Sequence, residues 1–240
     1  MHLTVIVPTY NEAENLPKLV SALFSLPLED LSVLIVDDNS PDGTGDLALL
    51  LGESYPGRLN VLRQPGKLGL GNAYLNGFRW ALAHGAHALA QMDADFSHPP
   101  EKLPEMLHTL RDWDIVMGSR YVKGGSVDDR WSFWRKSLSR FGNFYARTIL
   151  QMPFRDSTGG FRLWRRETLL GLPLARARSN GYAFQIEIAY MAYRLGYRSC
   201  EIPIHFADRR WGVSKMSFRI QLEAAIRVWQ LLYQYRDLRR

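Results

Sequence analysis

The sequence contains a single cysteine, Cys200, among its 240 residues. One thiol cannot form an internal disulfide bond, so the class of small secreted proteins held together by disulfides is excluded. The low cysteine content fits a reducing compartment. We expect Cys200 to be a small, buried, apolar residue.

Long apolar runs are also absent. No stretch approaches the roughly 18 consecutive apolar residues of a membrane-spanning helix, so we expect no such helix. The first residues lack a charged leader followed by a cleavage site, and they are expected to form a strand instead of a signal peptide. We find no internal repeat and no low-complexity linker. We therefore expect one domain over residues 1–240 with a substantial core.

Positive charge is concentrated in the second half of the chain. The formal net charge is +6, and residues 209–240 alone contain eight basic and two acidic residues. Residues 130–155 contain six basic residues. A basic surface of this kind is expected to face phosphates, a membrane or nucleic acid. A nucleic-acid-binding module is the alternative from another class of function. No recognised nucleic-acid-binding motif is present, which counts against it.

Apolar runs alternate with helical periodicity over the first 120 residues. Asn11 to Glu14 has the form of a capping box for a helix that continues to Phe24. Strands that alternate with helices predict an α/β fold with a mainly parallel central sheet flanked by helices. The expected strands are 3–7, 31–36, 59–62, 88–92 and 115–117, with further helices starting at 42–44 and spanning 72–84.

The pattern changes after residue 120. Helices are expected over 131–150, 182–195 and 215–236, with one strand over 199–204. Asp156 to Arg162 is expected to be a polar turn, and 205–214 a charged loop.

Acidic and polar residues follow three of the expected strands. They are Pro8 to Glu12 after the first strand, Asp37 and Asp38 after the second, and Asp93 and Asp95 after the fourth. Ligands of open α/β sheets bind at the carboxyl ends of strands. Two carboxylates one residue apart suit a divalent cation whose other positions are filled by diphosphate oxygens. The alternative for these acids is turn and helix-capping chemistry.

Gly66 to Gly71 forms a glycine-rich turn with the order Gly-x-x-Gly-x-Gly. It lacks the Lys-Ser/Thr ending of a phosphate loop and the glycine order of a dinucleotide-binding loop. We therefore interpret it as a tight turn whose backbone lies close to a nucleotide.

Taken together, these motifs resemble family-2 glycosyltransferases of the GT-A fold, and more narrowly the dolichol (polyprenol) phosphate mannose synthases among them. The resemblance covers nearly the whole chain. It rests on VIVPTYNE at 5–12, VDDNSPDGT at 36–44, MDADFSHPP at 92–100, GSRY at 118–121, DSTGGFR at 156–162 and DRRWGVSK at 208–215.

The resemblance implies an inverting transfer of mannose from GDP-mannose to a polyprenyl (dolichyl) monophosphate, with Mg²⁺ or Mn²⁺. Residues 1–120 would bind the nucleotide, and residues 121–240 would serve the acceptor and the membrane interface. The same fold acting on UDP-glucose is the alternative within enzymes. The protein would be peripheral, on the cytoplasmic side of a membrane, and a separate membrane-anchoring subunit is a further expected partner.

Site residues follow from the same resemblance. Asp93 and Asp95 would hold the metal, and Asp95 and Arg120 would be catalytic. Arg120, Arg135 and Ser139 would bind the acceptor phosphate. The nucleotide sugar would be bound by Pro8, Tyr10, Glu12, Val36, Asp38, Asp93, Ala94, Asp95, Arg120, Arg209 and Lys215.

This chain departs from the family pattern at two positions. Some relatives carry a glutamine metal ligand at the position of Ser97, and because serine is shorter, water is expected to replace that ligand. Relatives often carry glycine at the position of Asn39, which is a mild change because asparagine tolerates left-handed turns.

Aromatic and basic residues share two of the expected helices. This combination suits the lipid headgroup boundary, and the alternative is an ordinary helix that faces the core. The aromatic and apolar positions are Trp131, Trp134, Leu138, Phe141, Tyr145 and Ile149 on the first helix and Phe218, Leu222, Ile226, Trp229 and Tyr233 on the last. Arg135, Lys136, Arg140 and Arg147 are the basic positions of the first helix.

Overall fold

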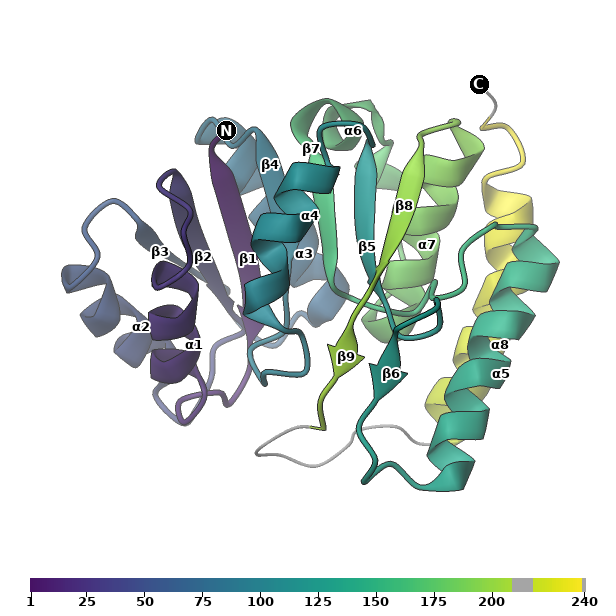
Figure 1. The fold of residues 1–240 in the computed structure, drawn as a ribbon, viewed down its shortest axis with the longest axis horizontal. Coiled ribbons are helices and arrows are strands. Elements are labelled where there is room, and N and C mark those ends of the chain that lie inside the picture. The colour runs from purple at the N-terminus through teal and green to yellow at the C-terminus, as the bar shows by residue number, and fades with distance from the viewer. Residues whose placement is uncertain (209–217, 239–240) are drawn as a thin grey trace.

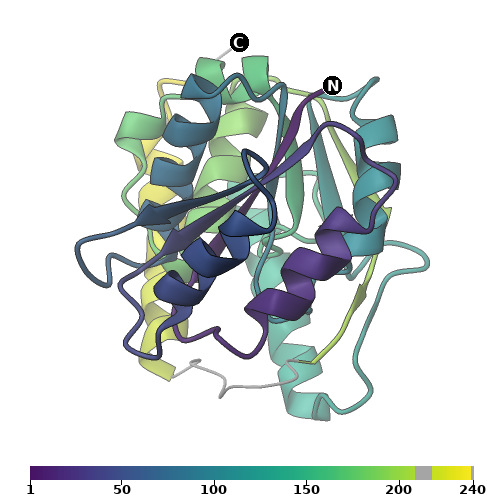
Figure 2. The same ribbon diagram turned by 90° about the vertical axis from the view of Figure 1, so that its left-hand side faces the viewer.

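The computed structural model describes residues 1–208 and 218–238, which form a seven-stranded sheet with helices on both faces (Figures 1 and 2). The strand order is β3-β2-β1-β4-β7-β5-β8. All pairs are parallel except those of β7, which runs antiparallel to both neighbours. The strands are β1 (Leu3–Thr9), β2 (Leu31–Asp37), β3 (Leu59–Arg63), β4 (Ala88–Gln91), β5 (Ile115–Ser119), β7 (Arg162–Arg165) and β8 (Ser199–Pro203).

Helices cover the sheet on both sides and extend beyond it at one edge (Figure 1). They are α1 (Leu16–Phe24), α2 (Thr44–Glu53), α3 (Leu70–Ala83), α4 (Leu103–Thr109), α5 (Phe133–Leu150), α6 (Arg166–Gly171), α7 (Gly181–Arg194) and α8 (Phe218–Gln234). Two short 3₁₀ turns cover Pro100–Lys102 and Leu174–Arg176. β6 (Ser126–Val127) and β9 (His205–Phe206) pair as a separate parallel ribbon.

The sheet separates two apolar cores. Val5 and Val7 of β1 face the core under α1 and α4, whereas Ile6 faces the core under α3 and α7. Burial on both faces explains why the strands are nearly continuous apolar runs, as expected for parallel sheets. The predicted α/β class and the positions of the strands over 3–7, 31–36, 59–62, 88–92 and 115–117 are confirmed.

The sequence analysis missed β7, because the segment was interpreted as a turn ending at Arg162. Two arginines in four residues are unusual for a central strand. The structure accommodates Arg162 because its guanidinium donates hydrogen bonds to the carbonyls of Gln185 and Ser157, at 2.6 Å each. Burial lowers the pKa of Arg162 to about 10.

The predicted capping box at Asn11 to Glu14 is wrong. Helix α1 begins at Leu16, and the side chain of its N-cap residue accepts no capping hydrogen bond. The backbone N–H groups of residues 11–13 instead donate to Ser40, Thr44 and Asp42 in the loop after β2. These hydrogen bonds join the loop after β1 to the loop after β2 and hold the carboxyl ends of the two strands together.

Two smaller expectations also differ, and a third is partly untested. Residues 205–206, expected to be loop, form β9. Cys200 is half-buried instead of buried. The last helix is described from Phe218, and residues 215–217 of its predicted range lie outside the described residues.

Candidate active site

A cavity of about 760 Å³ lies at the carboxyl ends of β1, β2 and β4. Seven of the residues expected to bind a nucleotide sugar line it: Pro8, Tyr10, Glu12, Asp38, Asp93, Ala94 and Asp95. The predicted meeting of three strand ends is therefore present. Val36 does not line this cavity, because its side chain is fully buried in the core against Gly77 of α3.

The two acids after β2 have different partners. Asp37 accepts hydrogen bonds from Thr9 and Ser40, which is the turn chemistry considered as an alternative. Asp38 accepts from the side chain of Gln64 at 2.9 Å and from the backbone N–H of Gly69 at 2.7 Å. Asp38 thereby fixes the glycine-rich turn beside the cavity. Asn39, between these acids and Ser40, has a φ of 56°, a left-handed conformation that asparagine tolerates.

The glycine-rich turn contacts the start of α7. Asn180 accepts a hydrogen bond from the backbone N–H of Gly71 at 2.8 Å. A Cβ on Gly71 would lie 2.6 Å from the carbonyl oxygen of Ser179, so only glycine permits this approach. Ser179 and Asn180 line the cavity together with Gly69. The turn thus shapes one wall of the cavity.

Several residues that line the cavity were missed by the sequence analysis. The amino group of Lys67 lies 3.7 Å from the ring centroid of Tyr10, which places a cation beside an aromatic ring in the cavity wall. Others come from the start of α7 and the segment before it, and from the second half of α8: Arg178, Ser179, Asn180, Tyr182, Arg227 and Gln230. These residues are distant from the strand-end motifs in the sequence and match no short motif, so only the fold brings them to the site.

Asp93 and Asp95 both face this cavity. The backbone N–H of Asp93 donates to Nδ1 of His98 at 3.0 Å, and Tyr74 donates to the Asp93 carboxylate at 3.4 Å. Burial, followed by the charge of Asp93, raises the pKa of Tyr74 well above its ordinary value, so this phenol stays protonated and can donate.

Ser97 supports Asp95 instead of facing a metal. Its hydroxyl donates to Oδ1 of Asp95 at 2.6 Å, and its backbone N–H donates to the same oxygen at 3.0 Å. Phe96, between them, has a φ of 61°, an unfavourable conformation for a bulky residue that is typical of functional turns.

The donor set fits a divalent cation that has few protein ligands. Asp93 and Asp95 supply carboxylate oxygens at one cavity wall, and Mg²⁺ and Mn²⁺ take such oxygens while keeping several non-protein ligands. Residues 1–208 and 218–238 contain no group of three or more His, Cys, Asp or Glu side chains placed to hold a metal. The remaining positions would therefore come from diphosphate oxygens and water.

Arg120 follows β5 and is held by Asp156. Its Nε and Nη2 donate to the two carboxylate oxygens of Asp156, each at 2.7 Å, and Nη2 also donates to Thr158 at 2.8 Å. Burial acts to raise the pKa of Asp156, but the charge and hydrogen bonds of Arg120 outweigh it, so the pKa is lowered. The pair is thus ionised and rigid, and among the described residues Nη1 has no acceptor.

The other predicted acceptor residues lie on α5, with different partners. Arg135 forms an ion pair with Asp208 at 2.9 Å, and its guanidinium lies 3.8 Å from the ring centroid of Trp131. Ser139 accepts a hydrogen bond from Tyr121 at 2.7 Å. Arg209 and Lys215 lie outside the described residues.

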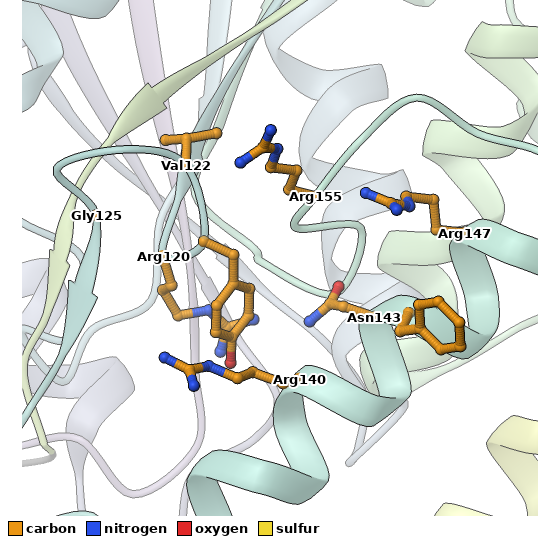
Figure 3. A pocket seen from close by; sticks show the side chains of 9 residues that line it. Arg120, Val122, Gly125, Arg140, Asn143, Arg147 and Arg155 are labelled. Carbon is orange, nitrogen blue, oxygen red and sulfur yellow. The ribbon is translucent and has the colours of Figure 1, made fainter.

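Arg120 lines a second cavity, of about 570 Å³, and does not line the first. Figure 3 shows this second cavity between the segment after β5, helix α5 and the segment after α5. Its described lining residues are Arg120, Tyr121, Val122, Gly125, Arg140, Asn143, Phe144, Arg147 and Arg155.

Exposed aromatic side chains gather on α5 and α8, which pack side by side at one edge of the molecule (Figure 1). On α5, Phe133 is 85% exposed and Trp134 is 74% exposed. Trp131, which we expected on this surface, is buried and contacts Phe206. We define the aromatic patch as Phe133, Trp134, Phe141 and Phe144 of α5 with Ile226, Trp229 and Tyr233 of α8, all exposed. The side chains of Phe218 and Leu222 lie outside the described residues.

No helix within residues 1–208 and 218–238 combines the length and apolar character needed to cross a bilayer.

Comparison with known proteins gives consistent matches. The family model for glycosyl transferase family 2 matches residues 4–170. The undecaprenyl-phosphate mannosyltransferase of Micrococcus luteus is 43% identical over 242 residues, covering 100% of this chain and 98% of that protein. The polyprenol monophosphomannose synthase of Mycolicibacterium smegmatis is 44% identical over 225 residues, covering 93% of this chain and 84% of that protein.

Solved structures share the fold at lower identity. A mannosyltransferase from Pyrobaculum calidifontis in complex with GDP-Man and Mn²⁺ has a TM-score of 0.60 at 22% identity, and the match covers 98% of this chain but 62% of that one. The glucosyl-3-phosphoglycerate synthase of Mycobacterium tuberculosis, solved with Mn²⁺ and UDP among other ligands, has a TM-score of 0.66 at 17% identity, covering 97% and 79%.

Proposed function

The chain belongs to glycosyl transferase family 2, and from this premise we propose that it transfers mannose from GDP-mannose to a polyprenyl monophosphate. The product is a polyprenyl phosphate mannose with a β linkage. The observation that carries the proposal is the identity of 43–44% to two polyprenyl-phosphate mannosyltransferases over most of each chain. The cavity with paired carboxylates at the strand ends supports it.

The donor occupies the cavity at the ends of β1, β2 and β4. Its volume of about 760 Å³ falls within the range of small-molecule sites, roughly 300–1,000 Å³. Pro8, Tyr10 and Glu12 form the wall for the nucleoside, with Lys67 beside Tyr10. Asp38 acts on this wall through the glycine-rich turn that it fixes.

Asp93 and Asp95 hold the divalent cation, Mg²⁺ or Mn²⁺. When bound, the cation neutralises charge on the diphosphate, which is the leaving group. Tyr74 and Ser97 donate hydrogen bonds to the carboxylates of Asp93 and Asp95, and His98 accepts one from the backbone N–H of Asp93. The protein thereby presents both carboxylates to one point before the donor arrives.

The acceptor phosphate needs no general base. A lipid monophosphate is already anionic at neutral pH, unlike a sugar hydroxyl. The protein must neutralise charge and place the attacking oxygen in line with the bond that breaks. Arg120 is suited to this task because Asp156 and Thr158 fix its orientation and Nη1 remains for the phosphate. A single displacement of this kind inverts the configuration at the anomeric carbon.

The acceptor brings the protein to a membrane surface. A polyprenyl chain stays in the bilayer, and the aromatic patch on α5 and α8 supplies exposed rings with basic neighbours. Aromatic and basic residues together suit the headgroup region of a bilayer. The protein therefore attaches peripherally, with α5 and α8 toward the lipid and, in keeping with its single cysteine, on the cytoplasmic face.

The experiment compares nucleotide sugars. GDP-mannose, UDP-glucose and GDP-glucose are each incubated with the protein, Mn²⁺ and detergent-solubilised polyprenyl phosphate, and the lipid-linked sugar is measured. We expect kcat/KM to be highest for GDP-mannose. A higher kcat/KM for UDP-glucose would assign the protein to the alternative donor, and no lipid-linked sugar from any donor would overturn the proposal.

A further inference from the structure

We propose that the cavity lined by Arg140, Arg147 and Arg155 binds the phosphate of an anionic membrane lipid that is neither donor nor acceptor. We call these three residues the arginine pocket. The proposal rests on the proposed membrane location, and its test does not depend on mannosyl transfer.

Three arginines from two segments line one cavity. Arg140 and Arg147 lie on α5, seven residues apart and therefore on one face of the helix, with Phe144 between them. Arg155 comes from the segment after α5, where Gln151 turns the chain in a left-handed conformation. Figure 3 shows the three side chains around the space that they line.

The arginine pocket lacks a compensating negative charge. None of the described residues that line the cavity is acidic. In the part of the chain that the structure describes, none of the three guanidinium groups forms an ion pair. The nearby carboxylate of Glu201 accepts the backbone N–H groups of Arg155 and Asp156 instead. Three like charges around one cavity repel one another unless an anion joins them.

Phosphate is the anion that this geometry fits. Guanidinium groups bind phosphate oxygens in a bidentate manner, so each arginine that lines the cavity offers a binding group for a phosphate headgroup. Asn143, at the base of the cavity, is buried with both ends of its amide engaged, so it shapes the floor and leaves the ligand to the arginines.

The arginine pocket is separate from the donor cavity, although Arg120 lines the same cavity as the arginine pocket. No described residue lines both this cavity and the donor cavity that contains Asp93 and Asp95. A phosphate bound by Arg140, Arg147 and Arg155 therefore lies outside the donor cavity. This phosphate lies beside Arg120, the residue that we propose to bind the acceptor phosphate.

The surroundings favour a lipid headgroup over a free anion. Phe144 lines the cavity and belongs to the aromatic patch, so the mouth of the pocket adjoins the surface that we place on the bilayer. Arg140 and Arg155 are exposed, and Arg147 is half-buried. A headgroup bound here, with its acyl chains in the bilayer, would fix the rotation of α5 on the membrane and hence the direction in which Arg120 meets the acceptor.

The test measures vesicle binding of a triple variant, Arg140→Gln with Arg147→Gln and Arg155→Gln. Co-sedimentation uses phosphatidylglycerol vesicles and phosphatidylcholine vesicles at low salt. A basic residue near an anionic surface strengthens binding roughly fivefold, so we expect the triple variant to bind phosphatidylglycerol on the order of 100-fold more weakly. Binding to phosphatidylcholine should not change.

The matched control removes the same charge elsewhere. Lys18→Gln, Arg79→Gln and Arg111→Gln alter three exposed basic residues on α1, on α3 and after α4. If this control weakens binding to phosphatidylglycerol as much as the triple variant does, net charge explains the effect and the proposal is overturned. Unchanged binding of the triple variant, or no binding by the unmodified protein, overturns it too.

Two further measurements distinguish other phosphate sources. In detergent with solubilised polyprenyl phosphate, the triple variant should keep its kcat and its KM for the acceptor. A raised acceptor KM with unchanged vesicle binding would assign the pocket to the acceptor phosphate and overturn the proposal. Calorimetric binding of inorganic phosphate that the triple variant loses, again with unchanged vesicle binding, would assign it to a free anion. If the protein shows no transfer activity but its vesicle binding depends on the arginine pocket, the proposed function is overturned and the proposal about the pocket stands.

Discussion

Asp93 and Asp95 are the residues on which the proposed chemistry depends most directly. We expect Asp93→Asn and Asp95→Asn each to reduce kcat by roughly 100-fold to 1,000-fold, because the cation stabilises the transition state by several kcal/mol. Activity is measured over a range of Mn²⁺ concentrations, with Asp112→Asn, an exposed acid after α4, as the control. Retention of full activity by both variants in the presence of EDTA would contradict the metal assignment.

Asp156 is a positioning residue that acts through Arg120. Removing one partner of a buried ion pair destabilises a protein by about 3–5 kcal/mol, so Asp156→Asn should lower the free energy of unfolding by about that much at neutral pH. The comparison is Asp237→Asn, which breaks an exposed pair with Arg176 and should have little effect. Denaturant unfolding gives both values.

The difference in free energy of unfolding between the protein and Asp156→Asn should decrease only at low pH. The pKa of Asp156 is lowered in the folded state, so its stabilisation is complete above the unfolded value of 3.8 and disappears as the pH falls through the lower folded value. The gap between the protein and Asp156→Asn should therefore be constant above about pH 5 and close in strong acid. A gap that instead closes between pH 6 and 8 would show that another group is responsible.

The sequence predicted correctly the positions of polar side chains that directly follow strands. The position of Asp93 and Asp95 at one cavity wall was predicted from two acids placed directly after an apolar run, and their roles stay a prediction. The arrangement of Ser97 could not be predicted, because its hydroxyl can face a metal or its neighbour Asp95, and the choice depends on the positive φ of Phe96. The engagement of Arg120 with Asp156 requires knowledge that β7 follows the Asp156 turn antiparallel to β5.

At the scale of elements, the glycine-rich turn is tested by adding a single methyl group. Gly71→Ala places a Cβ within 2.6 Å of the Ser179 carbonyl and should displace the start of α7 from the cavity. We expect the KM for the nucleotide sugar to rise by about tenfold, which corresponds to roughly 1.4 kcal/mol of binding. Gly66→Ala is the control, because a Cβ there meets nothing within 4 Å. Equal KM values for the two variants would contradict the role of this contact.

The aromatic patch on α5 and α8 is tested by vesicle binding. Trp134→Ser with Phe141→Ser should weaken binding to phosphatidylglycerol vesicles by roughly tenfold or more, because apolar burial at the interface contributes to attachment. The control is Leu49→Ser with Leu50→Ser, two exposed leucines of α2. Undiminished binding of the patch variant would indicate that α5 and α8 face a protein, such as an anchoring subunit, instead of lipid.

Sequence periodicity identified α5 and α8 as amphipathic but could not assign every aromatic residue. Trp131 precedes the helix and packs on Phe206 of β9, a strand that was itself unpredicted because it is two residues long. Phe133 and Phe144 are exposed although they fall outside the predicted face. The actual face is set by how α5 packs on α8, a tertiary contact that the periodicity of one helix does not reveal.

At the scale of the whole molecule, two cavities are formed by different parts of the chain. The donor cavity is formed largely by residues before 100 with the start of α7 and the second half of α8, and the second cavity by residues 120–155. The division into a nucleotide-binding half and an acceptor half remains a prediction. Residues of α7 and α8 belong to the second half of the chain but line the donor cavity. The length of the chain and the alternation of strand and helix patterns were enough to predict the fold class. β7 and the arginine pocket could be identified only from the folded structure.

The central claim is an inverting transfer of mannose to a lipid phosphate, and the configuration of the product tests it most directly. The protein is incubated with GDP-mannose, polyprenyl phosphate and Mn²⁺, and the anomeric configuration of the lipid-linked mannose is determined by NMR. Our account predicts a β-linked product, because one displacement on an α-linked donor inverts the anomeric carbon. An α-linked product would contradict it, since retention requires a different chemical path.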